Sequence, residues 1–218
     1  MNPELKIVLN RACLTEKFDE ALCFASQVHR RQKRKGTDIP YVSHIMAVAA
    51  IVMEYSGTED EAIAALLHDA IEDGEDAARV RKEIRDRFGE WVLCVVEECT
   101  DADVHPKPPW RERKEAYIAH VAHASASAHL VAAADKLHNA RSILRDRDLV
   151  GEEVWKRFKG GRDGMIWYLK TLASEYRKAG KAPAHLVGEL EKAVVEMEGK
   201  GKGRETRSAR LGAEKEER

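Results

Sequence analysis

The segment TEDEAIAALLHDAIEDGE, residues 58–75, decides the fold of this chain. Thr58 and Glu61 have the spacing of a capping box, in which the Thr hydroxyl and the Glu carboxylate satisfy free N–H groups at a helix start. The apolar residues that follow predict a helix from about Glu59 to Glu72 or beyond. The pair His68-Asp69 comes late in this helix, directly after the apolar run. Burying the charged form of Asp69 there is costly without a partner, and a metal cation would be such a partner.

Helical periodicity continues along most of the chain. Apolar residues recur at helical spacing through Phe18, Leu22, Ala25 and Val28, and no segment shows a convincing strand pattern. Gly57 can supply the left-handed turn that ends a helix beginning near Ser43. The further helices that we expect cover residues 15–34, 77–88, 90–101, 110–123, 127–145, 162–179 and 184–198, separated by Gly, Pro or Asp/Ser clusters. The fold class is therefore all-α.

Composition indicates one folded domain over residues 1–198. Of the 218 residues 44% are hydrophobic and 34% charged, which suits a folded chain with well-solvated helix faces. Residues 199–218 hold seven basic, four acidic and one large apolar side chain, so we predict a disordered tail. Residues 103–109 contain three prolines and should form an ordered loop or a mobile lid.

The net charge of −1 offers no overall attraction to nucleic acid or to an anionic membrane. We find neither an apolar run of transmembrane length nor a signal peptide, and we expect a cytoplasmic protein. The four cysteines form no CxxC pair, and we expect four buried or idle thiols: Cys13, Cys23, Cys94 and Cys99.

Two other residues extend the His-Asp pair into a candidate metal site. The dipeptide alone carries little weight, because about half an occurrence is expected by chance in this composition. His44 follows the extended segment IPYVSH, and Asp135 ends the apolar run HLVAAAD. Imidazole and carboxylate ligands suit Mn²⁺, Fe²⁺ or Zn²⁺, and such an ion makes a bound water acidic enough to attack phosphorus. The alternative is that His44 packs or caps and that Asp135 forms a structural ion pair.

Several polar residues could serve substrate chemistry beside this site. Glu72 and Asp73 follow His68 and Asp69 by four residues, so each acid shares a helix face with one of the pair and could move protons. The alternative to this role in proton transfer is that Glu72 and Asp73 form an ordinary acidic helix end. Asn139 shares a face with Asp135. The basic run at residues 30–35 could neutralise phosphates, although nucleic-acid binding is a competing use of such a run.

Three segments in this order resemble the HD hydrolase domain of the RelA/SpoT proteins and their small stand-alone relatives. They are RQKRKGTDIPYVSHIMAVAAIV, ALLHDAIEDGE and AAADKLHNARSILRD, and the resemblance covers about residues 18–180. It implies an all-helical domain that binds Mn²⁺ and removes the 3′-pyrophosphate of guanosine tetra- and pentaphosphate (ppGpp and pppGpp). We expect a hydrolase only, because 218 residues leave no room for the synthetase domain of the larger family members.

The resemblance also implies roles for individual residues. Metal ligands would be His44, His68, Asp69 and Asp135, with Glu72 and Asp73 as catalytic acids. Substrate-binding residues would be Arg31, Lys33, Arg34, Tyr41, Ser43, Lys136, Asn139 and Tyr168. Either Trp167 or Tyr168 could stack on guanine, although core packing is the usual fate of adjacent aromatics.

Other functions remain open at this stage. The chain could be an HD phosphohydrolase for another nucleotide, or a non-catalytic nucleotide-binding helical module. The partner that we expect is a small guanosine polyphosphate, with neither nucleic acid nor membrane. The number of subunits, a homo-oligomer included, is left open by the sequence.

Overall fold

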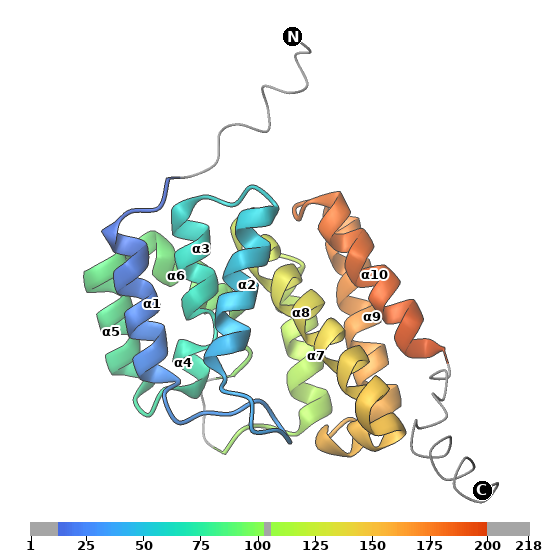
Figure 1. Cartoon of the computed structure of the whole chain (residues 1–218). Helices are drawn as coiled ribbons and strands as arrows, with labels where there is room; N and C mark the ends of the chain where they lie inside the picture. The colour runs from blue at the N-terminus through green and yellow to red at the C-terminus, as the bar shows by residue number, and fades with distance from the viewer. Residues whose placement is uncertain (1–12, 103–105, 200–218) are drawn as a thin grey trace, which may run out of the picture.

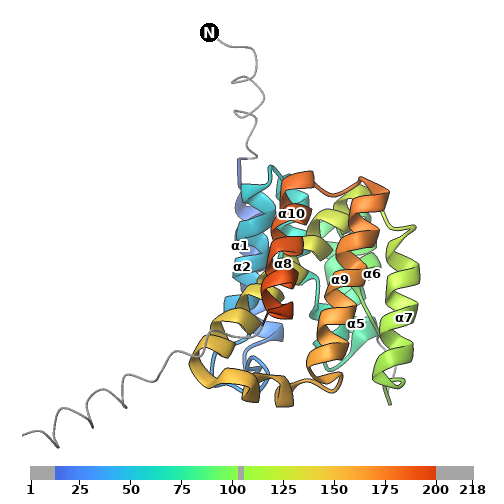
Figure 2. The ribbon, with the colours of Figure 1, turned by 90° about the vertical axis from the view of Figure 1, so that its right-hand side faces the viewer.

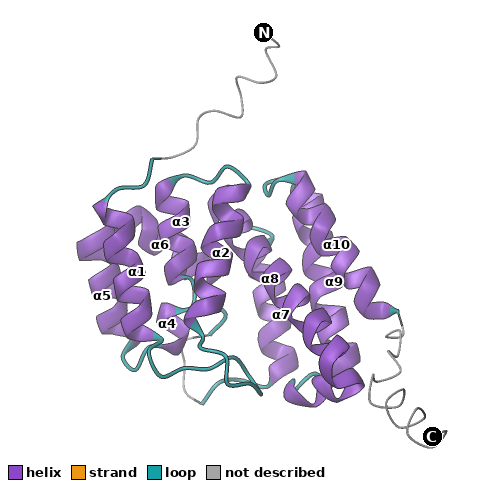
Figure 3. Ribbon diagram, viewed as in Figure 1, coloured by secondary structure: helices purple, strands orange, loops and turns teal. Residues whose placement is uncertain are grey.

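The chain folds into a bundle of helices, as the sequence predicts (Figure 1). The computed structural model describes residues 13–102 and 106–199. Within these ranges there is no strand, and the only pairing of that kind is an isolated antiparallel bridge between Lys33 and Pro40 (Figure 3). The α-helices are α1 (Glu16–Val28), α2 (Val42–Glu54), α3 (Glu59–Leu67), α4 (Ala70–Asp73), α5 (Ala77–Phe88), α6 (Glu90–Cys99), α7 (Trp110–Val121), α8 (Ala126–Val150), α9 (Gly161–Ala179) and α10 (Ala184–Glu198), and a 3-10 helix, η2 (Gly151–Arg157), follows α8.

The predicted capping box at the start of α3 is confirmed. Thr58 Oγ1 accepts a hydrogen bond from the backbone N–H of Glu61, and Glu61 Oε2 accepts one from the backbone N–H of Thr58. The six residues 62–67 are all buried, so α3 is covered on every side. A second carboxylate oxygen of Glu61 accepts a hydrogen bond from Ser127 of α8. The cap therefore also ties α3 to the longest helix.

The prediction of one continuous helix through Glu72 is wrong, because α3 ends at Leu67 and α4 begins at Ala70. The His68 ring contacts the Ala65 carbonyl oxygen through Nδ1 at 2.8 Å. That carbonyl is the acceptor that a continuing helix would offer to the N–H of Asp69. The backbone angles of His68 and Asp69 nevertheless stay in the right-handed helical region, so the interruption is local.

Other boundaries differ by a few residues or more. The first predicted helix ends early, at Val28, and residues 32–41 form a loop whose two arms are joined by Arg34 N–H to Ile39 O and Tyr41 N–H to Gln32 O. Helix α8 continues to Val150, five residues beyond the prediction, before η2, which the sequence did not reveal. Of the cysteines, only Cys99 is buried; Cys13, Cys23 and Cys94 are exposed, and all four are free thiols.

Helix α8 lies at the centre and packs against α2, α3, α6, α9 and α10 (Figures 1 and 2). Alanines at positions 132–134 are buried, and small side chains allow neighbouring helices to approach closely. Two arginines, Arg147 and Arg162, donate to backbone carbonyls at the end of α10. They satisfy the carbonyl groups that a helix end leaves unpaired.

Helix α7 lies at the edge of the bundle beside α9 (Figure 2). The Trp110 ring rests on Gly160 and Gly164, where an added Cβ would come within 2.6 and 3.1 Å of the indole. Asp101, directly after α6, pairs with Arg113 and with Lys114. These contacts position the start of α7.

The tail predicted for residues 199–218 lies outside the described residues from residue 200 onward, as do residues 103–105 of the proline-rich segment. No described helix has the length and apolar character that crossing a membrane requires.

We predict that Thr58→Ala lowers the free energy of unfolding by about 0.5–2 kcal/mol, because the first turn of α3 loses its side-chain cap. Urea denaturation measures this loss. Thr171→Ala is the matched control, because Thr171 lies inside α9 and its hydroxyl donates to the carbonyl of Trp167. Alanine is the better helix former there, so no loss is expected. Equal losses in both variants would contradict a capping role for Thr58.

Candidate metal centre and adjoining cationic pocket

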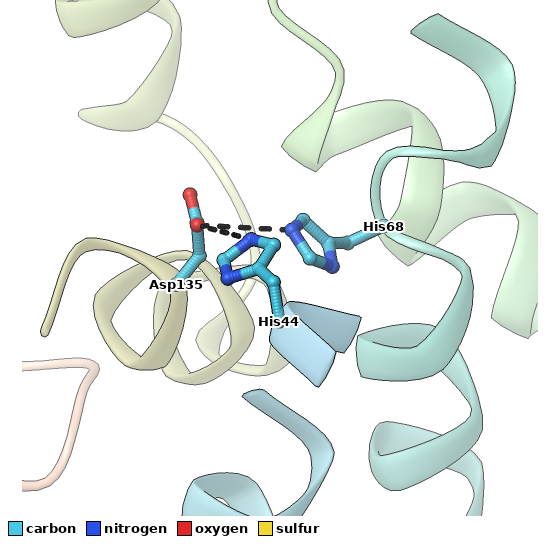
Figure 4. Close-up of side chains that lie close together, drawn as sticks. All are labelled: His44, His68 and Asp135. Atoms are coloured by element: carbon cyan, nitrogen blue, oxygen red, sulfur yellow. Dashed lines mark ion pairs between the residues drawn. The ribbon is translucent and has the colours of Figure 1, made fainter. Parts of the chain in front are cut away.

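Three side chains from three helices meet in the interior (Figure 4). His44 comes from α2, His68 follows the last residue of α3, and Asp135 comes from α8. One nitrogen or oxygen of each lies within 4.8 Å of the others, and all three residues are buried. The Nε2 atoms of His44 and His68 lie 3.2 and 3.8 Å from Asp135 Oδ1.

Asp69 joins the same group of atoms, although its side chain is less deeply buried. Its Oδ2 lies 3.0 Å from Nε2 of His68 and 3.7 Å from Nε2 of His44. The hydroxyl of Tyr41 donates to this oxygen at 2.5 Å. All four candidate ligands from the sequence are therefore brought together.

The orientation of the His68 ring follows from the helix break. Its Nδ1 carries the proton donated to the Ala65 carbonyl, so a neutral ring has its lone pair at Nε2. The Nε2 atoms of His44 and of His68 are both buried, and neither has a hydrogen-bond partner. Both face carboxylate oxygens without hydrogen-bond geometry. Buried nitrogens without partners are costly in a folded protein unless a cation or water occupies the space between them and the carboxylates.

The charges of the cluster show that it needs positive charge. Burial opposes ionisation of Asp135, yet Lys136 and the two imidazoles hold the pKa of that carboxyl well below its usual range. Burial also opposes protonation of His68, yet Asp69 and Asp135 raise the pKa of its imidazole well above the usual value. Without a metal, a proton on His68 would have to balance the two carboxylates.

A divalent cation fits this arrangement. Two imidazole nitrogens and two carboxylate groups form a donor set typical of borderline or hard divalent metals, and a cation between them would satisfy both unpaired Nε2 atoms. The other oxygen of Asp135 has its own partner, since Lys136 Nζ lies 2.5 Å from Asp135 Oδ2. The two imidazoles and two carboxylates therefore fit a divalent metal ion.

The two predicted catalytic acids lie in α4, where Glu72 lines the adjoining pocket and Asp73 is exposed and does not line it. Glu72 Oε1 is 2.8 Å from Lys107 Nζ and 3.6 Å from Arg113 Nη1. Asp73 Oδ2 accepts a hydrogen bond from Gln32 at 2.8 Å. Desolvation by the surrounding protein and the neighbouring Asp69 carboxylate raise the pKa of Asp73. The backbone N–H of Asp73 donates to the Asp69 carbonyl at 3.0 Å, which is the contact of one helical turn, so Asp73 follows Asp69 by one turn as the four-residue spacing predicts.

A pocket of about 380 Å³ adjoins the cluster. Tyr41, Lys136 and Asn139 line it and also contact the two candidate ligand carboxylates. Most of its charged side chains are cationic: Arg34, Lys35, Lys107, Arg113, Lys114, Lys136, Arg145, Arg157 and Lys159, against Glu72 and Asp146. The pocket therefore suits an anionic ligand.

Five of the predicted substrate-binding residues line the pocket, namely Arg34, Tyr41, Lys136, Asn139 and Tyr168. Asn139 connects a predicted metal ligand with a predicted substrate-binding residue. Its amide N–H donates to Asp135 Oδ1 at 2.5 Å, and its amide oxygen accepts from Arg34 at 2.8 Å. Tyr168 is buried and forms part of the wall, whereas Trp167 does not line the pocket.

The other three predicted contacts lie outside the pocket lining. Arg31 is exposed, Lys33 is exposed and pairs with Asp38, and the Ser43 hydroxyl donates to the Pro40 carbonyl. Extended backbone sends alternate side chains to opposite sides. Gln32 and Arg34 therefore turn inward, whereas Arg31 and Lys33 turn to solvent.

Sequence reasoning missed the far side of the pocket. Arg113 and Lys114 come from α7, Arg145 from the end of α8, and Arg157 from η2. No local pattern joins them, because they lie on three separate elements. A possible signal was the basic segment WRERK at residues 110–114, directly after the proline-rich loop.

Comparisons with known proteins agree with this architecture. Residues 21–166 match the protein family described as "HD domain". The guanosine-3′,5′-bis(diphosphate) 3′-pyrophosphohydrolase MESH1 of Xenopus tropicalis is 41% identical over 129 residues, which cover 58% of this chain and 69% of that protein. The Homo sapiens protein of the same name is 40% identical over the same shares.

Solved structures are similar as well. One, described as a metazoan ortholog of SpoT that hydrolyses ppGpp and plays a role in starvation responses, has a TM-score of 0.70 and 28% identity. That match covers 85% of this chain and 97% of the other. A protein from Listeria monocytogenes EGD-e has a TM-score of 0.61 and 28% identity, over 71% of this chain and 97% of its own. With its helical bundle, its clustered His and Asp residues and these matches, the chain belongs to the HD domain family.

Proposed function

We propose that this protein is a metal-dependent hydrolase that removes the 3′-pyrophosphate from ppGpp or pppGpp, giving GDP or GTP and pyrophosphate. The observation that carries the proposal is the position of the His44, His68 and Asp135 cluster, with Asp69 beside it, next to a pocket lined by nine cationic side chains. Its relatives named as guanosine-3′,5′-bis(diphosphate) 3′-pyrophosphohydrolases support the choice of substrate.

These four residues would hold the divalent cation, for which we propose Mn²⁺. Mixed imidazole and carboxylate ligation suits this ion, and Asp69 and Asp135 balance its charge. When bound, the cation supplies Lewis acidity at the phosphorus to be attacked. Tyr41 and Asn139 fix the ligand carboxylates by donating to Asp69 and to Asp135.

Glu72 and Asp73 would handle protons beside the scissile phosphate. A general acid or base works best when its pKa lies near the working pH, and the pKa of Asp73 is shifted upward, in that direction. Glu72 lines the pocket and is paired there with Lys107 and Arg113.

The rest of the pocket would bind the nucleotide. Arg34 is joined to the Asp135 carboxylate through Asn139, so it is placed to contact the 3′-linked phosphates. Lys35 and Lys159 line the pocket on the loop after α1 and after η2, and they provide charge for the remaining phosphates. Trp110 and Tyr168 offer aromatic surface for the guanine base. A free nucleotide substrate agrees with the cytoplasmic location that we propose.

The direct test incubates the purified protein with Mn²⁺ and, separately, ppGpp, dNTPs and nucleoside monophosphates. We expect pyrophosphate to be released from ppGpp, and chelation of the metal to stop the reaction. Hydrolysis of only the other nucleotides would indicate an HD phosphohydrolase with a different substrate. No hydrolysis at all, in a protein that binds ppGpp, would indicate a non-catalytic module.

We predict that His68→Ala loses bound metal and at least about 10³-fold in rate, because one ligand is removed from the cluster. Metal analysis of the purified protein and the ppGpp assay measure the two effects. His123→Ala is the control, because His123 is exposed near the end of α7. Metal content and rate that stay unchanged in His68→Ala would contradict the proposed site.

Arg34→Ala is expected to raise KM for ppGpp by roughly tenfold or more, because a charge-assisted contact to phosphate is removed. The same assay at varied ppGpp concentration gives KM and kcat. Arg30→Ala removes an exposed charge from the same basic run and should leave both constants near those of the unaltered protein. Equal effects of the two changes would mean that only the overall charge of the run matters.

Asp73→Asn is expected to lower kcat by about 100-fold or more with little change in KM, because Asn cannot exchange a proton. Glu75→Gln removes an exposed carboxylate two residues away and serves as the control. A normal kcat in Asp73→Asn would assign the proton transfer to Glu72 or to solvent instead.

A further inference from the structure

A third imidazole lies next to the metal cluster. His138, on α8 one turn after Asp135, has its Nδ1 2.7 Å from Nδ1 of His44. The two ring centroids are 4.8 Å apart, and His138 is partly buried. At this distance the two nitrogens share one proton, so that one ring donates and the other accepts. The hydrogen bond thus decides which nitrogen of His44 carries a proton.

We propose that His138 is a positioning residue that holds His44 in its metal-binding tautomer. In this arrangement Nδ1–H of His44 donates to Nδ1 of His138, and the lone pair at Nε2 of His44 faces Asp135. The inference rests on the cation site of the proposed function, but it does not depend on the substrate.

The geometry around Nε2 of His44 sets the direction of this hydrogen bond. That atom is buried, lacks a hydrogen-bond partner, and lies 3.2 Å from Asp135 Oδ1 and 3.7 Å from Asp69 Oδ2. If His138 donated instead, a neutral His44 would carry its proton at Nε2, in the space between the ligand atoms. A proton there would exclude the cation from that nitrogen.

The rings of His44 and His68 therefore differ in the group that accepts their Nδ1–H and fixes their orientation. His68 donates to the backbone carbonyl of Ala65, which can only accept. His44 donates to a side chain, which α8 supplies together with Asp135. One helix thus provides a ligand and the residue that orients a ligand on α2. Partners of this kind, which hold the second ring nitrogen of a ligand histidine, strengthen metal binding.

The test compares His138→Asn with His138→Leu. The two side chains have nearly the same shape, and the Asn oxygen can take the place of the accepting Nδ1. Mn²⁺ binding to the metal-free protein, without nucleotide, is measured by titration calorimetry. We expect His138→Leu to weaken binding by about 10–100-fold and His138→Asn by only about threefold. Equal affinities in both variants, whether normal or reduced, would overturn the proposal.

A double-mutant cycle separates positioning from general damage to the fold. In a His44→Ala background, His138→Leu should have no further effect on Mn²⁺ affinity if it acts through His44. A full additional loss in that background would contradict the proposal. Thermal unfolding of the metal-free variants checks that each is folded. If His138→Leu does not fold, His138→Gln replaces it, because its oxygen lies one bond farther along the side chain and should not restore the affinity.

Because the readout is Mn²⁺ affinity, the result is independent of the reaction. A protein that binds Mn²⁺ as expected but leaves ppGpp intact would refute the proposed function and leave the role of His138 standing. A protein that hydrolyses ppGpp while His138→Leu binds Mn²⁺ normally would refute the role of His138 and leave the proposed function standing.

Discussion

The constraint on which the structure depends is the burial of two carboxylates, Asp69 and Asp135, beside the same two imidazoles. Like charges brought together in a protein interior repel strongly, so each needs compensation by hydrogen bonds and by opposite charge. Lys136 pairs with Asp135, and Tyr41 donates to Asp69. Tyr41 donates to the same Asp69 oxygen that faces the imidazoles, and Lys136 reaches only the other oxygen of Asp135, so the space between the carboxylates and the imidazoles still needs a cation.

This constraint explains two features of the helices. The first is the interruption after Leu67, where the His68 ring occupies the Ala65 carbonyl through Nδ1 and leaves Nε2 facing the carboxylates. The second is the small-residue stretch before Asp135, where buried alanines let α2 and α3 approach α8 closely enough for the ligands to meet. A larger side chain at position 132, 133 or 134 would push these helices apart.

Much of the fold and the ligand cluster could be predicted from the sequence, because both leave local signals. The capping box fixed the start of α3, and the motifs around His44, His68 and Asp135 gave the candidate ligands. The pocket could not be predicted to the same extent. Arg113, Arg145 and Arg157 come from separate elements, and only the packing of α7 and η2 against the core brings them together. The loop before α2 shows a smaller failure, because its extended backbone selects Arg34 and turns Arg31 outward.

Asn139 shows how the metal cluster and the pocket act as one unit. Its amide has two distinct ends, and the structure engages both, with the N–H group on Asp135 and the oxygen on Arg34. The carboxylate fixes the orientation of the amide, and the amide in turn holds the guanidinium at the edge of the pocket. A phosphate that binds Arg34 therefore meets a group already ordered relative to the candidate metal ligands. Such preorganisation lowers the entropy that substrate binding must overcome, and it aligns the phosphate with the position where the reaction would occur.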